Sequence, residues 1–169
     1  MEEIRFRRAV AEDRDRIMEI IREARERMRR AGSDQWQRPY PAAEHIVADL
    51  ERGCGYVLEE QGTVVAYGAL LFDGEPAYEA LRGCWIGTPL YAVVHRLAVA
   101  DDRLRQGMAT RFMRESEALA RRCGMRSMRV DTNFDNAGML RLLAGSGYTF
   151  CGEVRYAHGS RRAYEKLLG

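Results

Sequence analysis

The residues best suited to chemistry lie where an apolar run meets a basic turn and then a helical pattern. Residues 97–99 form a strand-like run, residues 103–107 form the basic turn, and a helical pattern begins at Met108. The first N–H groups of a helix have no partner inside it, and the helix dipole adds partial positive charge there. This order of elements predicts an anion site that suits phosphate or pyrophosphate.

Size and charge limit the classes of protein to consider. The chain has 169 residues, of which 46% are hydrophobic and 31% charged, and its net charge is +2. This is the size and composition of one globular domain, so we expect a single domain over residues 1–169. A charge so close to balance does not call for nucleic acid or an anionic membrane as a partner.

The cysteines and the N-terminal residues bear on metal binding and compartment. No C-x-x-C pair and no histidine at zinc spacing occurs among the four cysteines, Cys54, Cys84, Cys123 and Cys151. We therefore expect no metal. The first residues lack the apolar core of a secretory signal, and no run approaches the roughly 18 apolar residues of a membrane span. We expect a cytoplasmic protein with reduced thiols.

Hydrophobic periodicity predicts how the elements are ordered along the chain. Strands are expected at residues 4–6, 56–58, 63–72, 91–99, 128–131, 148–150 and 163–168. Helices are expected at residues 11–30, 41–50, 107–123 and 136–144, and a long loop at residues 73–89. The order β-α-α-β-β-β-α-β-α-β-β mixes hairpins with crossover helices. It predicts an α/β (α+β) fold, a mixed sheet with helices on both faces.

Two motifs resemble those of the GNAT superfamily of N-acetyltransferases. Its loop pattern, Q/R-x-x-G-x-G/A before a helix, is matched at Gly107 and Ala109, while its first position is Leu104. Its second pattern, Asn-x-x-Ala-x-x-Leu-Tyr followed by Gly-Phe/Tyr, is matched in spacing from Asn136 to Tyr148. HRLAV, DTNFDN, YTFCG and AYEKLL also look like an uncharacterised bacterial subgroup of this superfamily.

The resemblance implies a fold, a co-substrate and the residues that hold it. The fold is a mostly antiparallel mixed sheet with a splayed central parallel pair. The activity is acetyl transfer from acetyl-CoA to a primary amine of a small molecule or peptide, and a homodimer is possible. Either Arg103 or Arg105 can supply the charge that Leu104 lacks. The residues that the resemblance implies for binding the co-substrate are Leu97, Ala98, Val99, Leu104, Arg105, Gln106, Gly107, Met108, Ala109, Thr110 and Asn136. Asn136 is equally suited to a plain helix cap.

An amine with a pKa near 10.4 must lose a proton before it attacks, so a general base is needed. His95, on the strand that leads to the thioester, is the first choice, although a structural histidine is an open alternative. Asp131 and Glu79 are rivals, and Asp131 can equally brace its turn. The tyrosine that often protonates the leaving thiolate in the family is replaced by Leu143, and Tyr148 suits a core aromatic better than that role.

The acceptor site is the part on which the residues say least. Trp36, Tyr40, Glu79 and Trp85 are the candidates, because aromatic rings and acids can hold an amine. Packing and ordinary loop roles are the alternatives for each. A second function remains open, that of an acyl-CoA-binding regulatory protein with little turnover, because Leu143 and a missing glutamate on the central strand depart from the family.

Overall fold

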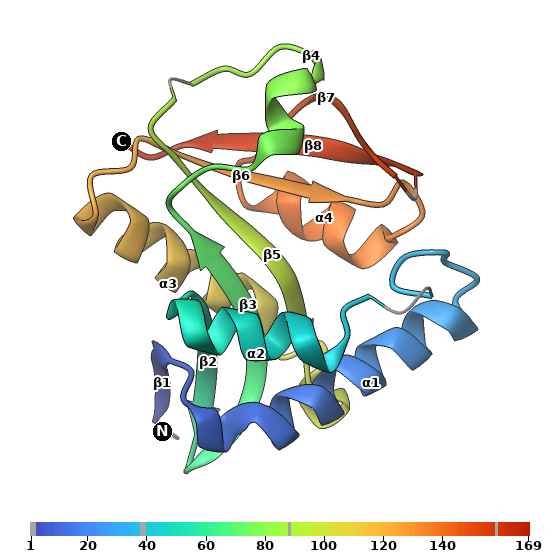
Figure 1. Ribbon diagram of the computed structural model, residues 1–169, viewed down its shortest axis with the longest axis vertical. Helices are drawn as coiled ribbons and strands as arrows, with labels where there is room; N and C mark the ends of the chain where they lie inside the picture. The colour runs from blue at the N-terminus through green and yellow to red at the C-terminus, as the bar shows by residue number, and fades with distance from the viewer. Residues whose placement is uncertain (1–2, 38–39, 88, 158) are drawn as a thin grey trace. The chain divides into compact units, whose positions relative to one another are not determined.

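The computed structural model describes residues 3–37, 40–87, 89–157 and 159–169. The chain forms two compact units (Figure 1). The first holds Met1–Leu70 and Arg96–Glu115, and the second holds Leu71–His95 and Ser116–Gly169. Strand β5 (Tyr91–Val99) and helix α3 (Met108–Arg122) each contribute residues to both units.

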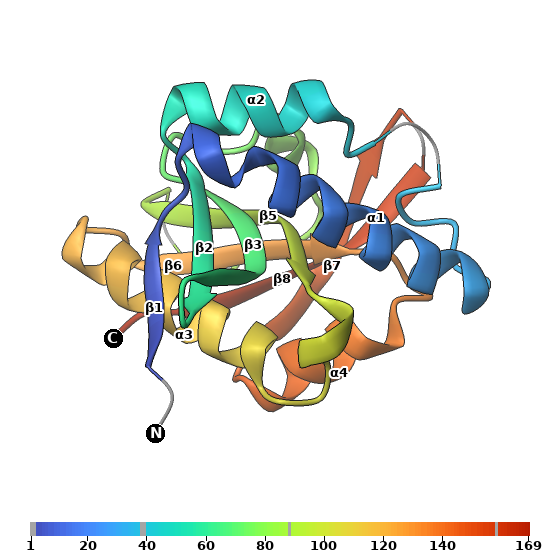
Figure 2. The ribbon, with the colours of Figure 1, turned by 90° about the horizontal axis from the view of Figure 1, so that it is seen from below.

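The first unit is built on three antiparallel strands, β1 (Ile4–Arg8), β2 (Gly55–Glu60) and β3 (Thr63–Leu71). Phe6 pairs with Leu58, and Leu58 pairs with Ala66. Helix α1 (Arg14–Arg30) follows a short 3-10 helix, and α2 (Ala43–Arg52) precedes β2. Figure 2 shows α1 and α2 next to each other on one side of these strands.

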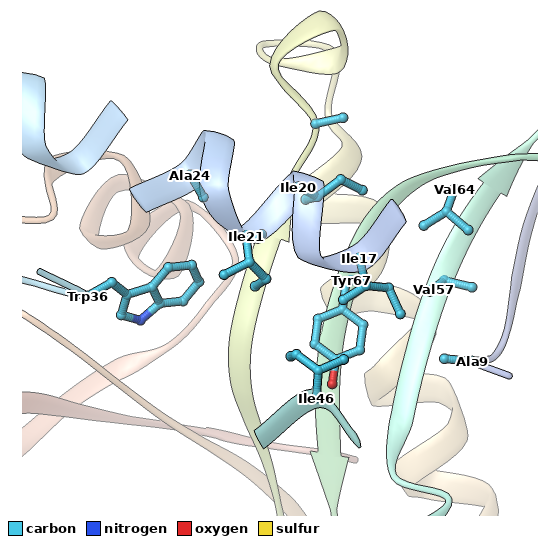
Figure 3. Packing of buried hydrophobic residues seen from close by; sticks show 12 residues of the cluster. Ala9, Ile17, Ile20, Ile21, Ala24, Trp36, Ile46, Val57, Val64 and Tyr67 are labelled. Carbon is cyan, nitrogen blue, oxygen red and sulfur yellow. The ribbon is translucent and has the colours of Figure 1, made fainter. Parts of the chain in front are cut away.

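The core of this unit lies between the helices and the strands (Figure 3). The fully buried residues of this core include Ile17, Ile20 and Ile21 of α1, Ile46 of α2 and Tyr67 of β3. The neighbouring residue in β3, Gly68, faces the other way, because successive strand residues point to opposite faces. A Cβ atom at Gly68 would lie 2.6 Å from the ring of Phe112 on α3. Helices therefore cover both faces of this part of the sheet, as predicted.

The second unit carries the strand order β5-β6-β8-β7-β4. Strand β5 runs parallel to β6 (Ser127–Thr132), and the pairs run from Tyr91 with Ser127 to Val93 with Arg129. The other pairs, between β6 and β8 (Gly159–Leu167), β8 and β7 (Thr149–Tyr156), and β7 and β4 (Arg82–Gly83), are antiparallel. Helix α4 (Ala137–Gly145) connects β6 to β7. The predicted mixed, mostly antiparallel fold with one parallel pair is confirmed.

The expectation of a long loop at residues 73–89 is wrong. This segment contains a 3-10 helix, Pro76–Ala80, and the short strand β4. At that strand the backbones of β4 and β7 approach so closely that a Cβ atom on Gly83 would lie 2.0 Å from the carbonyl oxygen of Cys151. Glycine at both Gly83 and Gly152 permits this contact, a requirement that reads as a loop signal in the sequence. Strands β7 and β8 are also longer than expected.

Among the helices of the described ranges, none is long and apolar enough to cross a membrane.

Candidate functional site

The start of α3 in the first unit has the geometry of an anion site. The carbonyl of Gly107 accepts the N–H of Arg111 at 2.9 Å, which is the first hydrogen bond of the helix. The N–H groups of Met108, Ala109 and Thr110 therefore precede that ladder and have no partner within it. Residues 104–107 are exposed, and a Cβ atom on Gly107 would meet no heavy atom within 4 Å. The loop can thus receive a phosphate group from the solvent side.

Two ion pairs of the first unit anchor the residues that precede this loop. Arg103 donates to the buried carboxylate of Glu60, and Arg27 bonds to Asp101 and, at 2.9 Å, to the carbonyl of Val99. Because Glu60 engages Arg103, Arg105 is the better of the two predicted arginines for contacting an anion. Arg105 is exposed and adopts a φ of 60°.

The other predicted residues of the loop and of β5 differ in exposure and in the contacts of their side chains. Gln106 donates to the carbonyl of Asp102 at 3.2 Å, so its side chain stabilises the turn. Leu104 is 37% exposed, and Ala98 and Val99 at the end of β5 are buried. Leu97 is half-buried. Leu97 to Gly107 thus form the segment ahead of α3, and Met108, Ala109 and Thr110 form the first turn of that helix.

Arg96, the residue before Leu97, belongs to a buried network that the sequence reasoning missed. Its guanidinium holds Asp49 of α2 with two hydrogen bonds, of 2.9 and 2.6 Å, and donates to the hydroxyl of Tyr40 at 2.8 Å. The hydroxyl of Tyr67 also donates to Asp49. A charged residue inside the apolar run YAVVHRLAV was the available signal, since a buried charge needs a partner.

Electrostatics within the network agree with this pairing. Burial lowers the pKa of Arg96, but Tyr40 and Asp49 outweigh it, so the pKa stands above its ordinary value. Burial, and then the Asp49 carboxylate, raise the pKa of Tyr67. Arg96 also adopts a φ of 59° within β5, a backbone conformation unusual for a residue with a side chain.

The predicted acceptor residues of the first unit are held by packing. Trp36 is only 7% exposed and joins the core cluster beside Ile21 (Figure 3). Tyr40 packs edge-on against His45, with ring centres 4.8 Å apart, and bonds to Arg96. These positions match the packing alternative for both residues.

In the second unit, His95 faces a carboxylate. Its Nε2 lies 2.8 Å from Oε2 of Glu75, and both side chains are less than one fifth exposed. Glu75 precedes the 3-10 helix, and its other carboxylate oxygen accepts the N–H of Ala77 at 3.2 Å. The sequence did not single out Glu75, because nothing local shows which acid of residues 73–79 reaches the histidine.

Asp131 of the same unit is bonded to two tyrosines. Its Oδ2 accepts the hydroxyl of Tyr78 at 2.7 Å and that of Tyr156 at 2.8 Å. The ring of Tyr78 packs edge-on near His95, with centroids 6.4 Å apart. Burial first, and then Asp131, raise the pKa of Tyr78, which keeps its hydroxyl protonated as a donor. Asp131 is thus connected to His95 through one aromatic ring.

Trp85 and Glu79, the other predicted acceptor residues, differ in exposure. The indole N–H of Trp85 donates to the carbonyl of Tyr78 at 3.0 Å, and the Arg129 guanidinium lies 4.2 Å from its ring centre. Arg129 is itself buried in an ion pair with Glu165 at 2.7 Å. Glu79 is exposed.

Residues of α4, and Tyr148 just before β7, bear on the cofactor and on the missing acid. Asn136 caps α4, and its side-chain oxygen accepts the N–H of Met139 at 3.2 Å. Leu143 is fully buried. The hydroxyl of Tyr148 donates to Glu117 at 2.9 Å, and Lys166 holds the same carboxylate at 3.0 Å. Tyr148 is therefore a buried core aromatic with an engaged hydroxyl.

Within the part of the chain that the structure describes, no group of histidine, cysteine and acidic side chains could hold a metal ion.

Comparisons with known proteins identify the family to which the chain belongs. The chain matches the model of the Acetyltransferase (GNAT) family over residues 15–148. It is 32% identical to a GNAT-family acetyltransferase of Streptococcus agalactiae with a known crystal structure. The two structures match with a TM-score of 0.89, and the match covers 97% of this chain and 95% of that chain. The chain therefore belongs to the GNAT acetyltransferase family.

Two more distant structures share the fold and were solved with a coenzyme. The protein yncA of Salmonella typhimurium, in complex with acetyl-CoA, is 18% identical, with a TM-score of 0.70 and coverage of 98% of this chain and 94% of that chain. The PaiA N-acetyltransferase of Thermoplasma acidophilum, in complex with coenzyme A, is 15% identical, with a TM-score of 0.74 and coverage of 98% and 99%. No protein of curated function is a significant match.

Proposed function

We propose that this protein is an acetyl-CoA-dependent N-acetyltransferase that moves an acetyl group to a primary amine of a small molecule or peptide, by direct attack in a ternary complex. The observation that carries the proposal is the exposed loop before α3, with N–H groups outside the helix ladder, in a chain of the GNAT family. The acetyl-CoA and coenzyme A complexes of structural neighbours support this choice of co-substrate.

The loop residues fit the acidic end of the co-substrate. The N–H groups of Met108, Ala109 and Thr110, with the exposed Arg105 beside them, bind a pyrophosphate. The backbone of residues 97–99 pairs with the pantetheine amides as an added strand would. Acetyl-CoA, when bound, supplies the acetyl group as a thioester.

His95 is the general base in this proposal. A primary amine is mostly protonated at neutral pH, so a proton must leave before the nitrogen attacks. Among the three predicted bases, Asp131 already accepts two phenol hydroxyls on one oxygen, and Glu79 is a solvent-exposed acid of the 3-10 helix Pro76–Ala80. His95 is partly buried, and a carboxylate orients it.

No side chain is assigned as the acid that protonates the leaving thiolate. Leu143 is apolar and buried, and the hydroxyl of Tyr148 is engaged by Glu117. A thiol with a pKa near 8.5 leaves tolerably without such help. The apolar Leu143 also favours the second candidate function, an acyl-CoA-binding regulatory protein with little turnover.

Release of CoA separates the two functions. We would incubate the protein with acetyl-CoA and a panel of aliphatic, aromatic and peptide primary amines, and measure free thiol and acetylated product. The enzyme predicts release that depends on one class of amine. Tight acetyl-CoA binding by calorimetry, without release for any amine, would support the regulatory protein instead.

Two matched glycine variants test the loop. Gly107 and Gly124 both have a positive φ, and a Cβ atom on either would meet no heavy atom within 4 Å. Gly107→Trp places an indole over the loop, so we expect at least a tenfold loss of acetyl-CoA affinity, about 1.4 kcal/mol. Gly124→Trp, at the other end of α3, imposes a similar backbone strain and leaves the affinity unchanged. Equal affinities of the two variants would refute the placement.

A further inference from the structure

The contact between His95 and Glu75 determines which ring nitrogen of the histidine carries a proton. A carboxylate has no proton to donate and can only accept. Because Nε2 of His95 lies 2.8 Å from Oε2 of Glu75, this nitrogen is the donor. In a neutral imidazole the other nitrogen, Nδ1, then holds the lone pair.

The carboxylate is itself held in place. Its Oε1 accepts the N–H of Ala77 at 3.2 Å, while the backbone N–H of Glu75 donates to the hydroxyl of Tyr91 at 3.2 Å. Both oxygens of the group and its backbone therefore have partners. A carboxylate bonded through both oxygens, on a residue whose backbone is also hydrogen-bonded, keeps one orientation relative to the imidazole, which a free surface acid does not.

We infer that Glu75 is a positioning residue that fixes His95 as the Nε2–H tautomer and makes Nδ1 the atom that accepts the proton from the amine. The role in catalysis rests on the proposed function, whereas the tautomer does not. The ammonium proton passes to Nδ1, directly or through water, and leaves the amine nitrogen with its lone pair. The resulting imidazolium retains its Nε2–H bond to the anionic Glu75, and its Nδ1 proton later passes to solvent or to the leaving thiolate.

Two nearby titratable groups that the structure describes, Tyr78 and Asp131, do not compete for Nε2. Tyr78 packs against His95 by its ring, and its hydroxyl donates to Asp131. Asp131 receives a second hydroxyl from Tyr156 on the same oxygen. Glu75 is therefore the group that selects the tautomer.

Glu75→Gln is a sharp test because the direction of its amide is dictated by its neighbours. The N–H of Ala77 needs an acceptor, so the amide oxygen takes the place of Oε1. The NH₂ group then points at Nε2 of His95 and donates to it. This reverses the bond and forces the proton onto Nδ1, with almost no change in side-chain volume.

Long-range ¹H–¹⁵N spectra of the imidazole rings read the tautomer without any substrate. The His95 signals would be assigned by comparison with His95→Gln, because the chain has two other histidines. At a pH where the ring is neutral, we expect the Nε2–H form in the native protein and the Nδ1–H form in Glu75→Gln. A native His95 in the Nδ1–H form, or an unchanged tautomer in the variant, would overturn the inference.

Steady-state kinetics with an amine that the native protein acetylates test whether Glu75 contributes to catalysis. We expect Glu75→Gln to lower kcat by about 100-fold, the lower end of what a general base contributes, with an unchanged KM for acetyl-CoA. Glu153→Gln, an exposed glutamate of β7 in the same unit, is the matched control and keeps the native kcat. An active native enzyme whose kcat is unaffected by Glu75→Gln would refute the positioning role. A native protein that acetylates no amine would refute the proposed function, while the NMR result would still decide the tautomer.

Discussion

Replacement of Asp49 by alanine should destabilise the protein strongly, because it leaves a guanidinium buried without its counter-ion. The side chains of Arg96 and Asp49 are 11% and 3% exposed, and two hydrogen bonds join them. The substitution also removes the acceptor of the Tyr67 hydroxyl. Both groups are then left in a site that solvent barely reaches.

The size of the effect follows from these losses. Breaking a buried ion pair by removing one partner costs about 3–5 kcal/mol, and an orphaned buried hydroxyl costs about 1–3 kcal/mol. The two losses share one site and are not additive, so we expect a decrease of about 4 kcal/mol in the free energy of unfolding. The free energy of unfolding of a folded domain is about 5–15 kcal/mol in total. A decrease of this size would lower Tm by roughly 8–16 °C.

Urea denaturation followed by circular dichroism measures this change. The control is Glu19→Ala, which removes a partner of Arg16 in a pair whose glutamate is 53% exposed, and should cost less than about 1 kcal/mol. The double variant Asp49→Leu/Arg96→Met removes both charges and should recover part of the loss. A decrease below 1 kcal/mol for Asp49→Ala, or no recovery in the double variant, would refute the argument.

Further predictions concern the loop, a buried thiol and a buried phenol. Leu104→Gln restores the side chain found at this position in the family pattern, and one added hydrogen bond predicts a roughly 2- to 10-fold gain in acetyl-CoA affinity by calorimetry. Burial, and then Asp49, raise the pKa of Cys54 to about 11, so its neutral thiol should resist iodoacetamide at pH 8, where mass spectrometry should find the two exposed cysteines alkylated first. Tyr148→Phe removes a hydrogen bond to Glu117 and should lower stability by about 1 kcal/mol without changing kcat, whereas a large loss of kcat would make this tyrosine the acid.

Local signals were sufficient for most of the elements. The predicted strand at residues 91–99 has the bounds of β5, and the predicted helix at residues 107–123 exceeds α3 by one residue at each end. Apolar periodicity and glycine stops are properties of neighbouring residues, which explains this accuracy. The cap formed by Asn136 is also local, because its partner, Met139, is three residues away.

The amino-acid sequence by itself thus determined the class of fold, the family and the segment suited to an anion, since each depends on residue types at short spacing. Only the tertiary structure decided which charges meet. Arg96 and Asp49 are 47 residues apart, and His95 and Glu75 are 20 apart. It also placed Trp36 in the core and engaged Arg103 with Glu60. Pairings of this kind depend on strand register and on how helices pack against the sheet, which residue types at short spacing do not encode.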